Sequence, residues 1–219
     1  MKKLLITVFT ALLTLAGSVN AQGPQNWGGF YVGGQGGYGW GNRDGCFGFT
    51  SACTDGTFDY DLEGGLAGGQ IGYNHMFNNF LLGIEADASF ASLSSDDDLL
   101  IGGFPAKGEY TYLATVGGRL GYAMNQFLIY GTGGFAIAGF DYENASGCTF
   151  DQTRDGYFVG GGAEFKITER ASVGVEYNYV DLGDESQPCT SFAVIPTISE
   201  AEATLNVVTF GFKYTFGGL

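Results

Sequence analysis

Basic residues are scarce in this sequence. The 219 residues include 9 lysines and arginines against 23 aspartates and glutamates, which gives a formal net charge of −14 at pH 7. Proteins that bind nucleic acid need clustered lysine and arginine to neutralise phosphates. The composition therefore argues against a nucleic-acid partner.

Long apolar runs are also missing after the N-terminal end of the chain. A membrane-spanning helix needs about 20 predominantly apolar residues, and no later stretch supplies them. The N-terminal end carries Lys2 and Lys3, an apolar stretch over residues 4–16 and a small residue at Ala21. This arrangement is typical of a cleaved secretory signal peptide.

We predict that residues 1–21 are removed during export and that residues 22–219 form one domain. Loss of Lys2 and Lys3 leaves seven basic residues against 23 acidic ones, and takes the net charge from −14 to −16. Without an apolar helix, the mature chain can enter a membrane only as a closed β-barrel.

Proline is scarce as well, with 4 residues, whereas glycine is abundant, with 39. Average proteins contain about 7% glycine, and collagen-like or disordered chains combine glycine with much proline. Glycine without proline favours strands whose backbones pack closely or kink.

Eight stretches alternate apolar and polar residues with the period of two that is typical of strands. Each is roughly 10 to 14 residues long, close to the roughly 9 to 11 that a tilted strand needs to cross a bilayer. The third is the clearest, because apolar residues from Phe80 to Phe90 alternate with Gly83, Glu85 and Asp87. The residues that define the alternation in these stretches lie within 27–40, 62–73, 80–90, 110–122, 127–140, 157–167, 173–179 and 208–216.

The connections between these stretches alternate in length. Those at residues 74–79, 123–126 and 168–170 are short, and the others are long. This alternation predicts an all-β, eight-stranded antiparallel up-and-down barrel with its long loops at one end. In the fifth stretch both faces are apolar, so its orientation is not assigned.

Alternation alone does not say whether the apolar face points outward or inward. Aromatic residues gather toward the strand ends, as in the two interfacial girdles of transmembrane barrels. We therefore predict an outward apolar face in a membrane, with a soluble lipocalin-like barrel as the alternative. The expected girdle residues are Trp27, Tyr31, Tyr38, Trp40, Tyr73, Phe80, Tyr110, Tyr122, Tyr157, Tyr214 and Phe216.

The polar faces carry charges of both signs. Charges inside a barrel are tolerated when they are paired, so the sequence predicts a polar and ionic network in the lumen. Its expected members are Gln70, Glu85, Asp87, Arg119, Glu164, Lys166, Glu176, Asn178 and Lys213.

Histidine is almost absent, since His75 is the single one in the chain. It falls in the first short connection, and general-base catalysis requires a partner within hydrogen-bond reach. We therefore expect no enzymatic activity, no cofactor and no metal site. We expect the acidic run at residues 96–98 to be a solvated surface, and the alternative function for this run is binding of a divalent cation.

All four cysteines fall in the predicted long loops. Exported proteins meet oxidising conditions, and four cysteines allow three pairings. We predict Cys46–Cys53 as a local clip and Cys148–Cys189 as a link between neighbouring loops. Pairing between the first and fourth loops is the open alternative, because the first and last strands adjoin when the barrel closes.

Several motifs in order along the chain resemble the small OmpA-like, opacity-type outer-membrane surface antigens, often labelled porin family. They are WGGFYVGG at residues 27–34, GGQIGYN at 68–74, GGRLGY at 117–122, LIYGTGGF at 128–135 and VEYNYVDLG at 175–183. The resemblance covers essentially the whole mature chain. It implies an eight-stranded outer-membrane barrel with an immunogenic or adhesive loop surface. Barrels of this family usually end in an aromatic residue that the assembly machinery reads, whereas here Gly217, Gly218 and Leu219 follow Phe216.

An eight-stranded barrel is just wide enough to be filled by its own side chains. We therefore expect a structural and surface protein of the Gram-negative outer membrane, which presents acidic, disulfide-clipped loops for envelope stability or adhesion. The expected partners are membrane lipid and lipopolysaccharide, the barrel assembly machinery, and host or environmental ligands at the loops. The alternative is a narrow, cation-preferring pore with Glu85, Asp87 and Glu176 near its constriction.

Overall fold

The computed structural model describes residues 26–48, 56–95, 99–101, 104–144, 149–187 and 197–217. The predicted signal peptide, the acidic run at residues 96–98 and the side chains of all four cysteines lie outside this described part. The predictions made for them therefore stay predictions.

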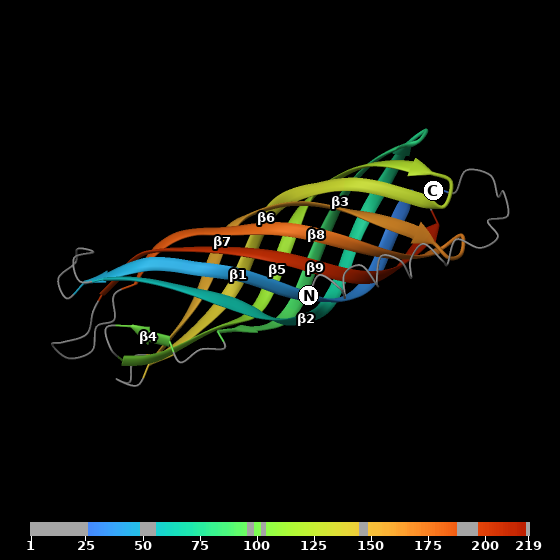
Figure 1. Ribbon diagram of the computed structural model, residues 1–219. Helices are drawn as coiled ribbons and strands as arrows, with labels where there is room; N and C mark the ends of the chain where they lie inside the picture. Colours follow the sequence, from blue (N-terminus) through green and yellow to red (C-terminus); the bar gives the residue numbers. More distant parts are fainter. Residues whose placement is uncertain are drawn as a thin grey trace, which may run out of the picture.

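The described chain folds into antiparallel β-strands that close into a barrel (Figure 1). Neighbouring strands follow the order β3-β2-β1-β9-β8-β7-β6-β5, and pairing of β3 with β5 closes the ring. The strands are β1 (Gly29–Gly48), β2 (Gly56–Phe77), β3 (Phe80–Ser94), β4 (Leu99–Ile101), β5 (Phe104–Met124), β6 (Phe127–Asn144), β7 (Thr149–Lys166), β8 (Ala171–Gln187) and β9 (Thr197–Gly217). The eight long strands confirm the predicted up-and-down barrel.

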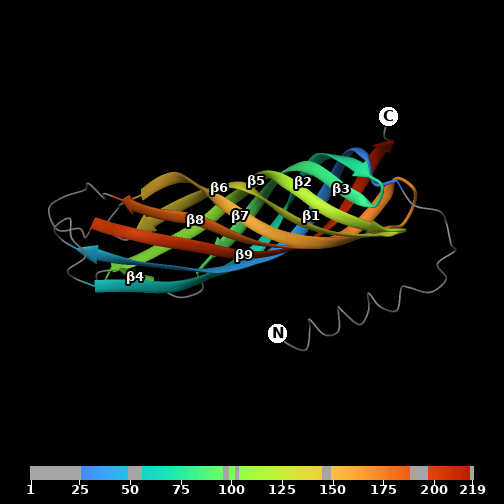
Figure 2. The same cartoon turned by 90° about the horizontal axis from the view of Figure 1, so that it is seen from above.

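Two features of the strands differ from the sequence-based prediction. A ninth, three-residue strand, β4, pairs with β5 alone and lies at the end of the long loops (Figure 2). The long strands also contain 15 to 22 residues, more than predicted. At about 3.3 Å per residue and a tilt of about 40°, the longest rises roughly 55 Å, twice the apolar band of about 25 Å in such barrels.

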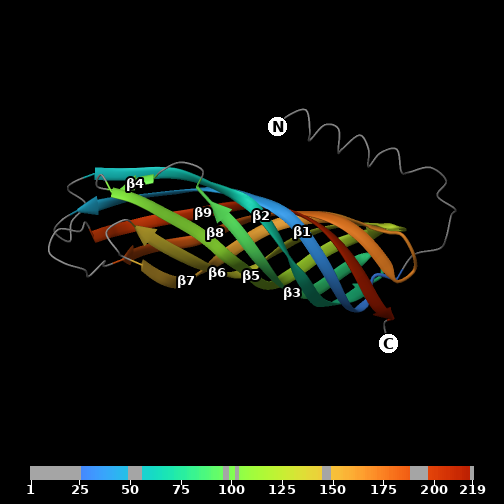
Figure 3. The ribbon, with the colours of Figure 1, turned by 90° about the horizontal axis from the view of Figure 1, so that it is seen from below.

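The short connections lie together at the opposite end of the barrel (Figure 3). Asn78 and Asn125 adopt positive φ values of 56° and 54° in two of them. Asparagine tolerates this left-handed conformation better than other non-glycine residues. In the third, the Thr168 hydroxyl accepts hydrogen bonds from the backbone N–H groups of Arg170 and Ala171.

An exposed apolar belt surrounds the half of the barrel that ends in the short connections. Its side chains are large, and Phe90 is 84% exposed. An apolar exterior around a charged interior is the reverse of a water-soluble barrel and fits an environment of lipid. Members of the belt include Phe30, Val32, Ile71, Leu82, Ile84, Val116, Leu120, Ile129, Phe135, Val159, Val173, Phe210 and Phe212.

Three residues expected in the aromatic girdles point inward instead. Tyr31 follows the outward Phe30, so alternation turns it into the lumen, and Trp27 is only 3% exposed at the lower end of the interior. Tyr110 is fully buried because a register shift between Tyr110 and Tyr112 reverses the alternation of β5. The assignment of these three side chains to the membrane interface was wrong.

The interior explains why the fifth predicted stretch has two apolar faces. In β6, Phe127, Ile129 and Phe135 face outward, while Leu128 and Ala136 are buried inside the barrel. Apolar side chains thus occupy both faces of this strand, and only the neighbouring strands fix which face is the inner one.

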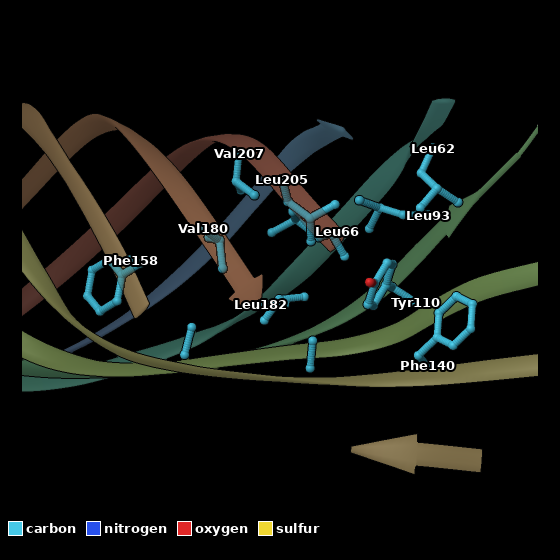
Figure 4. Packing of buried hydrophobic residues seen from close by; sticks show 13 residues of the cluster. Leu62, Leu66, Leu93, Tyr110, Phe140, Phe158, Val180, Leu182, Leu205 and Val207 are labelled. Carbon is cyan, nitrogen blue, oxygen red and sulfur yellow. The ribbon is translucent and has the colours of Figure 1, made fainter. Parts of the chain in front are cut away.

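The polarity of the wall reverses beyond the apolar belt, toward the long loops. There the interior holds a packed apolar cluster, which Figure 4 shows with Leu205 and Val207 of β9 and Tyr110 and Phe140 of β5 and β6. The outward side chains of the same segments are mainly acidic. They include Asp44, Asp59, Asp61, Glu63, Asp141, Asp151 and Asp155.

The ring of strands also divides in this upper part. Pairing of β2 with β3 ends at Glu63 and Ser94, and pairing of β7 with β8 ends at Tyr157 and Asp181. Beyond these points the described strands form two sheets, β8-β9-β1-β2 and β4-β5-β6-β7. The upper part therefore resembles a two-sheet sandwich, whereas the belt is a closed barrel.

Substitution of Leu205 tests this division. Leu205 is 1% exposed within the upper cluster, so Leu205→Ala should lower the free energy of unfolding by about 2–5 kcal/mol through lost contacts and a cavity. The matched control is Leu120→Ala in the lipid-facing belt, where the leucine is 65% exposed. Urea unfolding in detergent micelles, followed by tryptophan fluorescence, measures both. Equal losses in the two variants would contradict a packed core above the belt.

Candidate functional site in the barrel interior

Four charged side chains meet in the lumen at the level of the belt. Arg119 of β5 contacts Glu85 of β3 at 3.3 Å and also pairs with Glu164 of β7. Lys213 of β9 contacts Glu85 at 2.6 Å and Glu164 at 2.9 Å. Each cation thus touches both carboxylates, and this ionic cluster of Glu85, Arg119, Glu164 and Lys213 is electrically neutral.

Two tyrosines complete the ionic cluster. The Tyr31 hydroxyl donates to Glu85 at 2.6 Å and accepts from Arg119 at 3.0 Å. The Arg119 guanidinium lies 3.9 Å from the centre of the Tyr130 ring, a cation–π contact. Six side chains from β1, β3, β5, β6, β7 and β9 therefore converge across the barrel.

The sequence analysis missed both tyrosines. Tyr31 could have been identified, because it lies two and four residues before Gly33 and Gln35 and therefore on the same inward face of the strand. Tyr130 was harder to identify, because within residues 127–140 the inner face of β6 is marked by a single further polar residue, Thr132, among apolar ones. Tyrosine is suited to this position, since its ring is apolar and its hydroxyl needs a partner when buried.

Glycines on the neighbouring strands make room for the two rings. A Cβ atom at Gly72, opposite Tyr31, would lie 2.3 Å from the tyrosine oxygen. One at Gly162, opposite Tyr130, would lie 2.6 Å from that oxygen. A side chain at either glycine would push the adjacent ring away from the ionic cluster, which explains part of the glycine content.

The other five residues expected in the network lie outside the ionic cluster. Glu176 accepts hydrogen bonds from the Tyr130 hydroxyl at 2.6 Å and from Asn178 at 2.7 Å. Asp87 accepts one from Thr115 at 3.3 Å, and Gln70 donates one to Gln35. Lys166 lies lower, where it donates to the carbonyl of Glu169 and sits 5.0 Å from the Trp27 ring.

Packed side chains occupy the interior above and below the ionic cluster. Below it lies a second apolar cluster, made of Trp27, Leu81, Ala123, Leu128 and Tyr130. Above it lies the cluster between the two sheets. A cavity of ≈ 10 Å³ remains beside the ionic cluster, lined in part by Gln35, Gln70, Glu176 and Thr209. That volume is about one water molecule.

Basic side chains are concentrated inside the barrel. Five of the seven basic residues of the predicted mature chain are buried, and Arg170 is exposed in the last short connection. The side chain of Lys107 lies outside the described part. The buried five are Arg43, Arg119, Arg154, Lys166 and Lys213.

The chemistry available to the described residues is limited. His75 lies at the exposed end of β2, and its ring packs at 4.6 Å against Phe77. Within the described segments, no group of three or more histidine, cysteine, aspartate or glutamate residues is arranged to hold a metal ion. The same segments contain no helix able to cross a membrane.

A closed antiparallel barrel with an apolar exterior and an ionic interior defines a class, the outer-membrane β-barrels. The family model described as "Outer membrane protein beta-barrel domain" matches residues 9–216. The chain belongs to this family. Its location is accordingly the outer membrane of a Gram-negative bacterium, where barrels direct their short turns to the periplasm and their long loops outward.

Relatives with curated names agree with this assignment. The chain is 35% identical over 160 residues to a 22 kDa outer membrane protein of Rhizobium leguminosarum bv. viciae, covering 71% of this chain and 64% of that protein. It is 30% identical over 172 residues to a 31 kDa outer-membrane immunogenic protein of Brucella melitensis, covering 74% and 70%. The chain therefore aligns with slightly less than two thirds of the Rhizobium protein.

Solved structures support the fold alone. OprG of Pseudomonas aeruginosa superimposes with a TM-score of 0.61 at 18% identity, over 91% of this chain and 100% of OprG. The outer membrane protease OmpT of Escherichia coli does so with a TM-score of 0.53 at 11% identity, over 90% and 99%. At such low identities a shared barrel says nothing about a shared activity.

Removal of Arg119 should disrupt the ionic cluster. Arg119→Met leaves two buried carboxylates with Lys213 as their one remaining cation in the cluster, and breaking a buried pair typically costs about 3–5 kcal/mol. We expect a loss of this size in the free energy of unfolding, measured in urea with detergent micelles. Arg170→Met, in an exposed turn, is the control and should change stability little. A stable Arg119→Met barrel would show that the cluster contributes little to the fold.

Gly162→Ala tests the room left for Tyr130. The new methyl group would meet the tyrosine hydroxyl and the carbonyl oxygen of Val175, both 2.6 Å away. Overpacking of this kind costs about 1–3 kcal/mol, which should appear as a lower urea midpoint. The control is Gly65→Ala, where nothing lies within 4 Å of the added atom. The idea is refuted when the two variants unfold at the same urea concentration.

Proposed function

We propose that this protein is a structural and surface-interaction protein of the outer membrane, with its barrel as a closed anchor. The observation that supports this most directly is the filled interior. Apolar clusters lie above and below the neutral ionic cluster, and the cavity beside it is close to the size of one water. Such an interior leaves little room for solutes to pass.

The upper two-sheet part is the element that meets the surroundings of the cell. It extends the wall beyond the membrane by about 20 Å, from roughly eight further residues per strand at 3.3 Å each and a tilt of 40°. Its outer face is acidic, and we infer that lipopolysaccharide is its neighbour in the outer leaflet. We infer that this part and its loops serve envelope stability or adhesion. The name of the Brucella relative, an immunogenic protein, supports an exposed surface of this kind.

We propose no enzymatic role for the chain. The carboxylates of the ionic cluster are held by Arg119 and Lys213 and are buried. His75 lies at the periplasmic end, far along the strand from the loops. These placements offer no pair of acid and base groups at an accessible surface.

A narrow cation pathway is the second candidate. The interior holds Asp87 and Glu176 in addition to the two carboxylates of the ionic cluster, so four carboxyl groups accompany Arg119 and Lys213 at this level of the barrel. An excess of carboxylates would favour cations over anions in any passage that opened there. Among the described residues, this excess is the feature that favours a pore.

Single-channel recording separates the two candidates. The mature chain, refolded and inserted into a planar bilayer, should give no steady openings if the packed clusters close the lumen. A gel that distinguishes the folded from the heat-denatured form confirms that the barrel is intact. Steady cation-selective openings would overturn the closed anchor and support the pore.

A further inference from the structure

The division of the upper wall leaves several strand edges without a described partner, and one of them lies on β2. Along residues 56–62, β2 pairs with β1 on one side. On the other side its pairing with β3 ends at Glu63. β4 continues upward beyond β3, but it pairs only with β5. Among the described strands, none forms a ladder with this edge, which we name the β2 edge.

An unpaired strand edge presents a row of backbone N–H and C=O groups to any extended polypeptide. Such edges are used for recognition by strand addition, in which main-chain hydrogen bonds supply affinity and alternate side chains supply specificity. The β2 edge lies above the apolar belt, and the side chains of Asp59 and Asp61 along it are exposed to solvent. In the membrane the same strand is paired on both sides.

The side chains of the β2 edge indicate the charge of a fitting partner. Asp59 and Asp61 are exposed on its outward face. Asp59 also lies directly across from Asp44 of β1, so like charges already face each other there. Like charges on opposite strands destabilise a sheet, and opposite charges stabilise it. A strand with lysine or arginine at alternate positions would relieve this repulsion.

The same charges argue against a second copy of this chain as the occupant. Antiparallel pairing of two β2 edges would bring Asp59 and Asp61 close to their counterparts. Basic side chains that could offset them are mostly buried: Arg43, on the adjacent strand, points into the barrel. Acidic residues on an edge thus protect it from self-association while leaving it open to a basic strand.

We propose that the β2 edge binds an extended segment of a partner polypeptide with basic residues at alternate positions. The bound segment would add a strand beside β2 and place its lysine or arginine side chains next to Asp59 and Asp61. This inference rests on the proposed role of the upper part as an interaction surface and specifies the chemistry of its partner.

The first experiment measures binding of a defined probe to the full mature chain in lipid nanodiscs. The probe is a fluorescein-labelled peptide of about eight residues that alternates lysine and valine, and a second peptide carries the same residues as two blocks. Fluorescence anisotropy at about 0.15 M salt should show the alternating peptide binding at least about tenfold more tightly. Equal affinity for both peptides would overturn the proposal, because it would mean attraction by charge alone.

A matched pair of variants tests whether the peptide binds at the β2 edge. Asp61→Lys should weaken binding of the alternating peptide by about tenfold, because it puts a like charge beside the incoming lysines. Asp141→Lys makes the same change on β6, which is paired with β5 and β7 on its two sides. It should change binding by less than about threefold. Equal losses in the two variants would show that the β2 edge is not the site.

Backbone methylation tests strand addition itself. A strand beside one edge uses the N–H groups of every second residue. Of two peptides methylated on alternate nitrogens in opposite phases, one should therefore lose binding and the other keep it. If both bind like the unmethylated peptide, no strand is added and the proposal fails. If no peptide binds while the barrel remains silent in bilayers, this inference fails alone and the proposed function stands.

Discussion

In the apolar part of a membrane, no water is available to bond with backbone N–H and C=O groups, and this constraint governs the wall of the barrel. Each such group must find its partner within the protein, which only a closed ring of strands or a helix achieves. The pairing of β3 with β5 meets the constraint by removing the last free edge. Alternation along the strands then sends every second side chain inward, so charged residues become buried and must be paired.

The ionic cluster follows from that requirement. Arg119 and Lys213 each bridge Glu85 and Glu164, so no charge of the four is left without an opposite partner. Tyr31 and Tyr130 fill the remaining space, and they fit because Gly72 and Gly162 lie beneath their rings. Glycine, tyrosine and charge therefore form one packed unit in the lumen, and the barrel is filled at this level.

Above the membrane the constraint is lifted, and the structure changes accordingly. Water can bond with free backbone groups, so the ring no longer needs to close, and it divides between β2 and β3 and between β7 and β8. Burial of apolar surface becomes the main stabilising contribution there. In the belt, leucines, valines and aromatic residues face outward to lipid. In the upper part, apolar side chains face inward and form the cluster around Leu205 and Phe140, and acidic residues face outward.

The sequence by itself determined the class, the number of long strands, the ends that carry long loops and the inward position of Glu85, Arg119, Glu164 and Lys213. Period-two alternation predicts the strands and the residues that share a face, the lengths of the connections predict the end with the long loops, and aromatic residues near the strand ends predict an outward apolar face. Tertiary structure alone decided which charges pair, since that depends on register across strands. It also decided that Tyr110 turns inward, because of a register shift. The division into two sheets could not be predicted from the sequence either. The point at which two strands stop pairing depends on where the neighbouring strand ends or turns away, and the residues of one strand do not show it.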